Sequence, residues 1–165
     1  MIGAIATREP TVPAPATAPT YRLIDADAHV NEPPTLWTDR VASKHVAHVP
    51  HLEHFEEGDG WVLDLVKDPI NFGMNVAAAM PREQRGPWAR FADIPRGGYD
   101  PAVRLTEMDA DAIDAAVQYP TPRLSHLMIA HPDRELHLAM IRAYNDWLVE
   151  YCSHDPSRLG AIVLL

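Results

Sequence analysis

The chain has 165 residues, enough for one domain with a real core but fewer than the roughly 250 of a typical (β/α)8 barrel. It carries 14 Lys and Arg against 23 Asp and Glu, a formal net charge of -9. Nucleic acids and anionic membranes favour basic surfaces, so this balance argues against both as partners. The single cysteine, Cys152, rules out an intramolecular disulfide and fits a reducing compartment.

Residues 1–20 differ in composition from the rest of the chain. Several prolines stand there among Ala and Thr, which is typical of a disordered, Pro/Ala-rich tail. The segment has no basic region followed by an apolar run, so it does not resemble a secretory signal. No stretch of the chain approaches the roughly 18 apolar residues of a membrane span. We therefore expect one folded domain over residues 21–165, located in the cytoplasm.

Residues 21–33, Tyr-Arg-Leu-Ile-Asp-Ala-Asp-Ala-His-Val-Asn-Glu-Pro, predict a strand with one apolar face. Alternation along that strand would place Asp25, Asp27 and His29 together on the other face. These groups are costly to bury unless their charges are matched, and a divalent metal is the simplest match. The alternatives are a chance D-x-D-x-H string, a turn capped by Asp25, and a structural His29. A D-x-D site for a metal and a diphosphate is disfavoured because nothing Gly-rich or basic lies nearby.

Residues 31–98 predict a long insertion after this strand. Four histidines follow at intervals of three, at positions 45, 48, 51 and 54. A second metal site is one interpretation, but Pro50 would break the helix needed to align them, which favours a solvated helical turn. Residues 56–60 then predict a turn and residues 61–66 a strand. We expect residues 71–98 to form an ordered excursion, packed by aromatic side chains.

From Tyr99 onward, helices and strands alternate. Asp100 as N-cap and Pro101 at the first helical position predict a helix to about Ala110. Residues 113–119 predict a buried strand, closed by Pro120-Thr121-Pro122. Pro132 opens a second predicted helix with an apolar stripe to Tyr151, which we interpret as core rather than cofactor contacts. Residues 159–165 predict a third strand.

This order predicts βαβ units and a parallel sheet covered on both faces. Parallel α/β proteins place their chemistry at the carboxyl ends of the strands, where Asp27, His29, Tyr119 and Thr121 fall. A chain that stops in an apolar strand leaves an unpaired edge. We therefore predict an α/β fold that is an incomplete (β/α)8 TIM barrel, with its first three strands and a long insertion after strand 1.

Three ordered segments are similar to a known family. They are residues 24–29 (Ile-Asp-Ala-Asp-Ala-His), residues 104–109 leading to 113–121, and residues 143–148 through 155–159. Together they resemble the amino-terminal part of the amidohydrolase-related family, in the branch that includes aminocarboxymuconate-semialdehyde decarboxylase. The resemblance covers about residues 21–165. It implies a (β/α)8 barrel whose first strand ends in His-x-His, Glu-x-His or Asp-x-His.

By this resemblance, Asp27 and His29 bind one divalent metal, with zinc expected first and manganese or magnesium as alternatives. Tyr119 and Thr121 would line the pocket for a small-molecule substrate. The implied enzyme is a metal-dependent hydrolase or a carboxy-lyase (decarboxylase) acting on a small carboxylate-bearing aromatic or unsaturated substrate. The role of Asp25, which matches a frequent acid of the family, stays open.

The sequence departs from the family in one respect. Family members complete the metal site with a His from a middle strand and an Asp from the last strand, and residues 1–165 reach neither. We therefore expect a truncated chain that is inactive alone. The alternative is a non-catalytic barrel fragment that associates with a complementary chain, and a homodimer is a further possibility.

Overall fold

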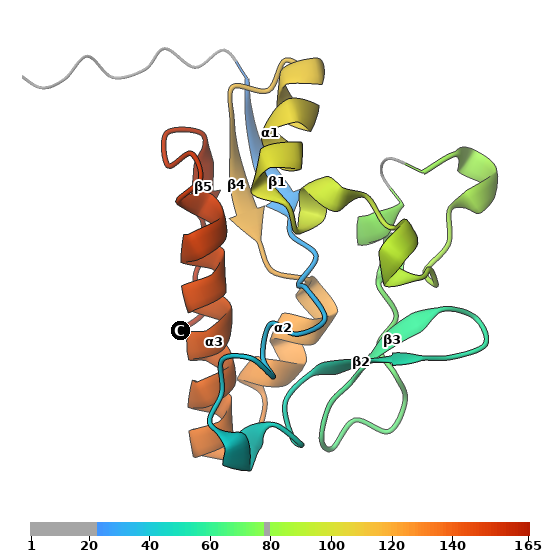
Figure 1. The fold of residues 1–165 in the computed structure, drawn as a ribbon, viewed down its shortest axis with the longest axis vertical. Coiled ribbons are helices and arrows are strands. Elements are labelled where there is room, and N and C mark those ends of the chain that lie inside the picture. Colours follow the sequence, from blue (N-terminus) through green and yellow to red (C-terminus); the bar gives the residue numbers. More distant parts are fainter. Residues whose placement is uncertain (1–22, 78–79) are drawn as a thin grey trace, which may run out of the picture.

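The computed structural model describes residues 23–77 and 80–165, so the predicted tail lies outside the described residues (Figure 1). A parallel sheet has the order β1 (Ile24–His29), β4 (Ala115–Tyr119), β5 (Leu159–Ala161). Its helices are α1 (Pro101–Ala110), α2 (Pro122–Ile129) and α3 (Arg134–Cys152). The predicted α/β class with a parallel sheet is confirmed.

The helices α1 and α3 begin at side-chain caps. The carboxylate of Asp100 accepts hydrogen bonds from the N–H groups of Ala102 and Val103, at 3.1 and 3.2 Å. Asp133 caps α3 in the same way, so that helix starts after Asp133 and not at Pro132 as predicted. Each cap satisfies backbone donors that have no partner within the helix.

The helix α2 is a correction to the prediction, which treated Pro120-Thr121-Pro122 only as the end of a strand. Pro122 is the first residue of α2. Proline is well suited to that position because its missing N–H has no helical partner there. The helix leads directly into α3 and packs against it.

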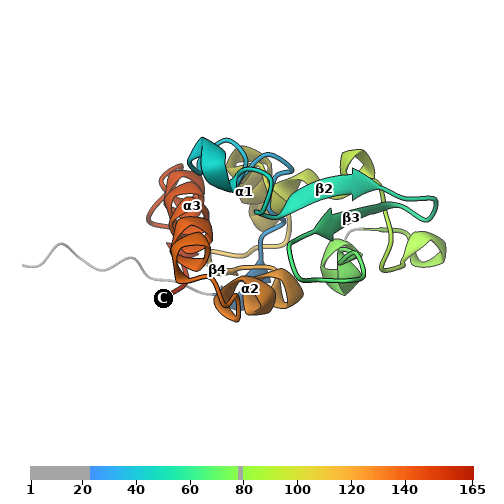
Figure 2. The same ribbon diagram turned by 90° about the horizontal axis from the view of Figure 1, so that it is seen from below.

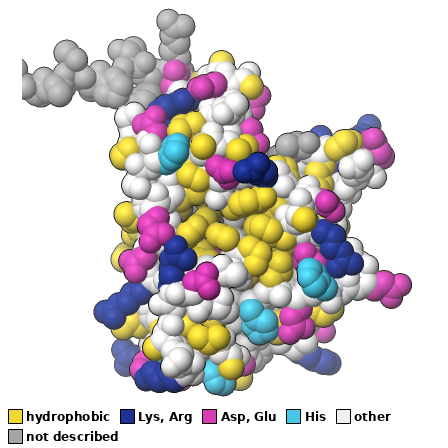
Figure 3. Space-filling model, viewed as in Figure 1, with side chains coloured by type: hydrophobic (Ala, Val, Ile, Leu, Met, Phe, Trp, Pro, Cys, Tyr) yellow, Lys and Arg dark blue, Asp and Glu magenta, His cyan; other side chains and the backbone are white. Residues whose placement is uncertain are grey.

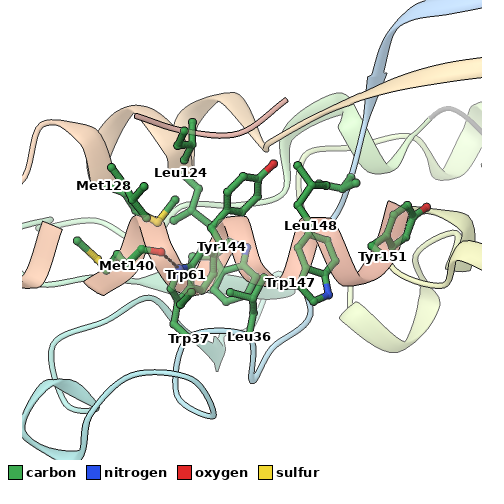
Figure 4. Close-up of a cluster of buried hydrophobic side chains, with 14 of the residues drawn as sticks. Leu36, Trp37, Trp61, Leu124, Met128, Met140, Tyr144, Trp147, Leu148 and Tyr151 are labelled. Atoms are coloured by element: carbon green, nitrogen blue, oxygen red, sulfur yellow. Dashed lines mark hydrogen bonds between the residues drawn. The ribbon is translucent and has the colours of Figure 1, made fainter. Parts of the chain in front are cut away.

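The hydrophobic core is built around α3, whose apolar stripe is buried as predicted (Figure 4). Tyr144 and Leu148 are fully buried, and Trp147 is nearly so, which confirms their core role. Trp37 approaches from the segment after β1 and donates its Nε1–H to the carbonyl of Met140 at 3.1 Å. The Trp37 ring meets Trp61 of the insertion edge to face, with centroids 5.4 Å apart. Through Trp37, this pair joins the later part of the insertion to α3.

The insertion contains a two-stranded antiparallel hairpin, β2 (His51–His54) and β3 (Asp59–Val62). It also has the short 3-10 turns η1 (Ser43–His45), η2 (Gly73–Val76), η3 (Arg82–Gln84), η4 (Phe91–Asp93) and η5 (Arg96–Gly98). The predicted turn is shorter than expected, because residues 59 and 60 belong to β3, which ends at residue 62 rather than 66. Figures 1 and 2 show the hairpin on the opposite side of the molecule from α3.

The four histidines of the insertion do not share one helix. His45 ends η1, while His51 and His54 are the two ends of β2. Each of the four lies near a carboxylate, for example His48 Nδ1, which is 2.5 Å from Asp64 Oδ2. The histidines are therefore spread over a turn and a strand, and each is paired with an acid, His45 with Glu135 of α3 and the others within the insertion.

Asp59 links the hairpin to the following turn η4. Its side chain is 3 % exposed and accepts hydrogen bonds from Arg90 Nη1 at 2.9 Å and from the N–H of Phe91 at 2.8 Å. His54 Nδ1 lies 2.6 Å from the same carboxylate. This buried acid holds together two parts of the insertion that are about thirty residues apart.

The strand β5 is shorter than predicted, since pairing stops at Ala161. The next residues are held by α3: Asn145 donates to the carbonyl of Leu164 and accepts from its N–H, each at 2.8 Å.

Hydrophobic side chains gather in the middle of the face seen in Figure 3, with charged groups around them. Within residues 23–77 and 80–165, no helix is long and apolar enough to cross a membrane.

Candidate metal site

Asp27 and His29 lie at the carboxyl end of β1, as the sequence predicts. The Nδ1 atom of His29 is 3.9 Å from Asp27 Oδ1 and 3.2 Å from the carbonyl oxygen of Asp27. When Nδ1 carries the proton, it donates to that carbonyl and leaves the Nε2 lone pair for a metal. The Asp27 side chain is 87 % exposed and that of His29 is 25 % exposed, so both are accessible to a ligand.

Asp25 does not join this pair on one face, which corrects the expected strict alternation. The register is irregular between Asp25 and Ala28: Asp25 pairs with Ala116 and His29 pairs with Tyr119. Ala116 and Tyr119 are three residues apart on β4, so their side chains point to opposite faces of the sheet. The Oδ1 atom of Asp25 accepts from the N–H of Asp27 at 3.0 Å, a local turn contact within the irregularity.

Tyr119 and Thr121 both lie close to the carboxyl end of β1, but their surroundings differ. The Tyr119 ring lies beside the His29 ring, with centroids 5.9 Å apart and planes inclined by 31°. Thr121 is 6 % exposed, and both its N–H and its hydroxyl are bonded to Glu32. Tyr119 is therefore adjacent to the candidate metal pair, whereas the Thr121 side chain is taken up by a buried contact.

Glu32 lies next to this site, bonded to Thr121, and its role was not predicted from the sequence. Its side chain is almost fully buried, with 1 % of the residue exposed. Burial raises the pKa of Glu32, although hydrogen bonds from Thr121 oppose that effect. A signal was present, because Glu32 is an acid three residues after His29 and directly before Pro33.

The carboxyl end of β1 is fastened to α1 by Arg104. Its Nη2 donates to the carbonyl of His29 at 2.6 Å and its Nε to the carbonyl of Gly97 at 2.9 Å. Val30 N–H then donates to the carbonyl of Tyr119 at 2.9 Å. The peptide group that follows His29 is thus held from two elements, by Arg104 of α1 and by Tyr119 of β4.

A cavity of about 650 Å³ opens beside Asp27 and His29, between β1, α1 and the insertion. Its acidic lining includes Asp25, Glu107 and Asp111, and the guanidinium of Arg104 also borders it. Amide and thioether groups of the insertion and of α1 complete it, among them those of Asn31, Asn75, Met74 and Met108. Tyr119 and Thr121 do not belong to this lining.

The donor set fits part of a metal site. An Asp oxygen and a His nitrogen are ordinary ligands of zinc, manganese and related metals. The 3.9 Å separation of Asp27 Oδ1 and His29 Nδ1 shows that the two side chains are neighbours at the end of β1. Among the residues that the structure describes, no three His, Cys, Asp or Glu side chains converge to hold a metal ion. A catalytic zinc usually has three protein ligands, so this pair alone would not complete such a site.

No protein-family model matches the sequence, and no curated protein matches it. A solved structure with a similar fold is an amidohydrolase from Mycobacterium avium subsp. paratuberculosis K-10. The TM-score is 0.55 at 22% sequence identity, over 88% of this chain and 42% of that chain. The fold resembles part of an amidohydrolase. The described sheet is consistent with part of an amidohydrolase barrel, and the chain spans less than half the length of the neighbour.

Proposed function

We propose that the chain is part of a metal-dependent enzyme of the amidohydrolase superfamily, with Asp27 and His29 as two ligands of one divalent metal. The supporting observation is the placement of this pair, 3.9 Å apart at the end of β1 and open to the cavity. The similarity to an amidohydrolase fold raises the expectation of this chemistry. In this proposal the remaining ligands come from polypeptide beyond the described residues.

A divalent metal at such a site would polarise a carbonyl and lower the pKa of a bound water, or would orient a carboxylate that leaves as carbon dioxide. In this proposal, the residues of this chain hold the metal and orient the side chains that bind it. Arg104 fixes the His29 carbonyl, and the His29 ring packs beside Tyr119. An Asp ligand places more negative charge on the metal than a His would, which suits manganese or magnesium as well as zinc.

We propose a small carboxylate-bearing molecule as the substrate, for either hydrolysis or decarboxylation. The carboxylates of Asp25, Glu107 and Asp111 surround the cavity and would repel such an anion. Only Arg104 and the metal would attract it. Substrate binding should therefore depend on the metal, a dependence that both reactions share.

The test is Co²⁺ or Zn²⁺ titration of the purified chain by calorimetry, with Asp27→Asn and His29→Ala variants. We expect either variant to weaken binding by about tenfold or more, because each removes one direct ligand. Asp64→Asn and His48→Ala are matched controls, since they change another exposed Asp and His pair at 2.5 Å. Isotherms unchanged in His29→Ala would contradict the proposal.

A second function, association with a complementary chain, is favoured by the exposed apolar residues after β5. Ile162 is 37% exposed and Val163 43% exposed, and no described strand pairs with the outer edge of β5. We propose a barrel-forming partner or a second copy at this edge. Light scattering across a hundredfold concentration range tests it: a constant monomer mass would contradict self-association, and a rising mass would support it.

A further inference from the structure

We propose that Glu32 is a positioning residue of the candidate metal site, a clamp that fixes the chain after β1 to the chain after β4. This inference rests on the proposed function for its metal readout. Its geometric part concerns how His29 and Tyr119 are held side by side, and that part can be tested without metal.

The clamp consists of hydrogen bonds between two short segments. The N–H of Thr121 donates to Glu32 Oε1 at 2.9 Å, and Thr121 Oγ1 lies 2.5 Å from Glu32 Oε2. Thr121 Oγ1 is also 3.3 Å from the carbonyl oxygen of Val30. With the bond from Val30 N–H to the Tyr119 carbonyl, residues 30–32 and 119–121 are joined at four points.

All these contacts are satisfied when Glu32 is a neutral acid. With its proton on Oε2, Glu32 donates to the Thr121 hydroxyl, and that hydroxyl donates to the Val30 carbonyl. The Thr121 N–H still donates to Oε1. No Lys or Arg of the described residues is hydrogen-bonded to Glu32, and the nearby His29 favours a negative charge there only through space.

The clamp lies directly beyond the two rings that flank the candidate site. His29 precedes Val30, and Tyr119 lies two residues before Thr121. Without the Glu32 side chain, the buried N–H of Thr121 loses its partner, which favours separation of the two segments. The contact between the His29 and Tyr119 rings would then loosen, and His29 would no longer be held for a metal.

The test compares Glu32→Gln with Glu32→Ala in the full chain. Glutamine offers an N–H to the Thr121 hydroxyl and an oxygen to the Thr121 N–H, so it reproduces the neutral acid. We expect the Co²⁺ dissociation constant to stay within about twofold for Glu32→Gln and to rise about tenfold for Glu32→Ala. The exposed Glu53 provides a control, and Glu53→Ala should leave the constant unchanged.

A second pair of variants covers the case in which Glu32→Ala does not fold. Thr121→Ser keeps the hydroxyl and Thr121→Val removes it at nearly the same volume. Serine should bind Co²⁺ like the wild type, and valine severalfold more weakly. Equal affinity in folded Glu32→Ala or Thr121→Val and the wild type would overturn the clamp, as would a Glu32→Gln protein that is as weak as Glu32→Ala.

Failure of the proposed function gives a different result. If the wild type binds no Co²⁺, the metal proposal fails, and the clamp is judged from the ¹H–¹³C spectra of the His29 and Tyr119 rings. Ring signals that move in Glu32→Ala but not in Glu32→Gln would support the clamp. Ring signals identical in all three proteins would overturn it.

Discussion

The buried carboxylate of Asp59 should stabilise the whole insertion, and Asp59→Asn tests this. An asparagine can present only one oxygen where the carboxylate presents two. Its amide group would face either the Phe91 N–H or the Arg90 guanidinium, both of which are donors. One donor is then left without a partner and the charge-assisted bonds are lost.

The expected loss follows from the burial of each partner. The Asp59 side chain is 3 % exposed, whereas Arg90 is 42% exposed and His54 82 % exposed, so solvent weakens both of these side-chain contacts. The bond from the Phe91 N–H is the better shielded contact. We expect Asp59→Asn to lower the free energy of unfolding by about 2 kcal/mol. In a chain of this size, that is roughly 4–8 °C in Tm.

The dependence on pH gives a second check. Burial alone would raise the pKa of Asp59, but hydrogen bonds from Phe91, His54 and Arg90 outweigh burial and lower it below its ordinary value of 3.8. The ionised group thus adds stability above that value, and the contribution is lost as the pH falls through the lowered pKa. The wild type and Asp59→Asn should therefore differ at pH 7 and converge in stronger acid.

Urea unfolding followed by tryptophan fluorescence measures this difference, and hydrogen exchange of the Phe91 amide locates it. Asp64→Asn is the matched control: its carboxylate pairs with His48 at 2.5 Å, but the side chains are 44% and 52% exposed. We expect it to change stability by less than about 0.5 kcal/mol. Equal stability of wild type and Asp59→Asn at pH 7 would refute the reasoning.

Three further outcomes are expected. The Tyr144 hydroxyl is buried without a hydrogen-bond partner among the described residues, so Tyr144→Phe should raise the free energy of unfolding by up to about 1 kcal/mol in urea titrations; a clear loss would reveal a hidden partner. Asn145→Ala removes both bonds to Leu164 and should cost about 2 kcal/mol, with faster exchange of the Leu164 amide. Burial raises the pKa of the Cys152 thiol to about 11, so at pH 8 it should react with a disulfide reagent at least about tenfold more slowly in the folded chain than in urea.

Local signals in the sequence predicted the elements that depend on local chemistry. Asp100 followed by Pro101 predicted the start of α1 correctly, because a cap needs only its own helix turn. The apolar stripe of α3 was recognised for a similar reason, since helical spacing indicates one buried face. The helix α2 was missed although Pro122 was a usable signal, because prolines on both sides of Thr121 were taken to end a strand.

The features that were missed depend on distant partners. The irregularity in β1 follows from its pairing with β4, so the position of Asp25 relative to His29 is not visible in residues 24–29 alone. The role of Glu32 depends on Thr121, 89 residues further along the chain. The prediction that Asp27 and His29 lie together at the end of β1 was correct. Their role as metal ligands stays a prediction.

The sheet order has a consequence for how the chain assembles. Asn145 and Leu164 are 19 residues apart, and Arg158 reaches the carbonyl of Ile113 over 45 residues. The contact of β1 with β4, by contrast, spans 91 residues from Leu23 to Asp114. Closing a longer loop costs more chain entropy, so β4, α3 and β5 can form a template before β1 is added.

Pulsed hydrogen exchange during refolding would show this order as protection of β4 and α3 amides ahead of those in β1; simultaneous protection would contradict it. In that sequence of events β1 is the closing strand, and the pairing irregularity forms when it docks. The two candidate ligands therefore acquire their geometry in the last step of sheet formation. Any metal that they hold would be bound by the finished fold and would not guide its early stages.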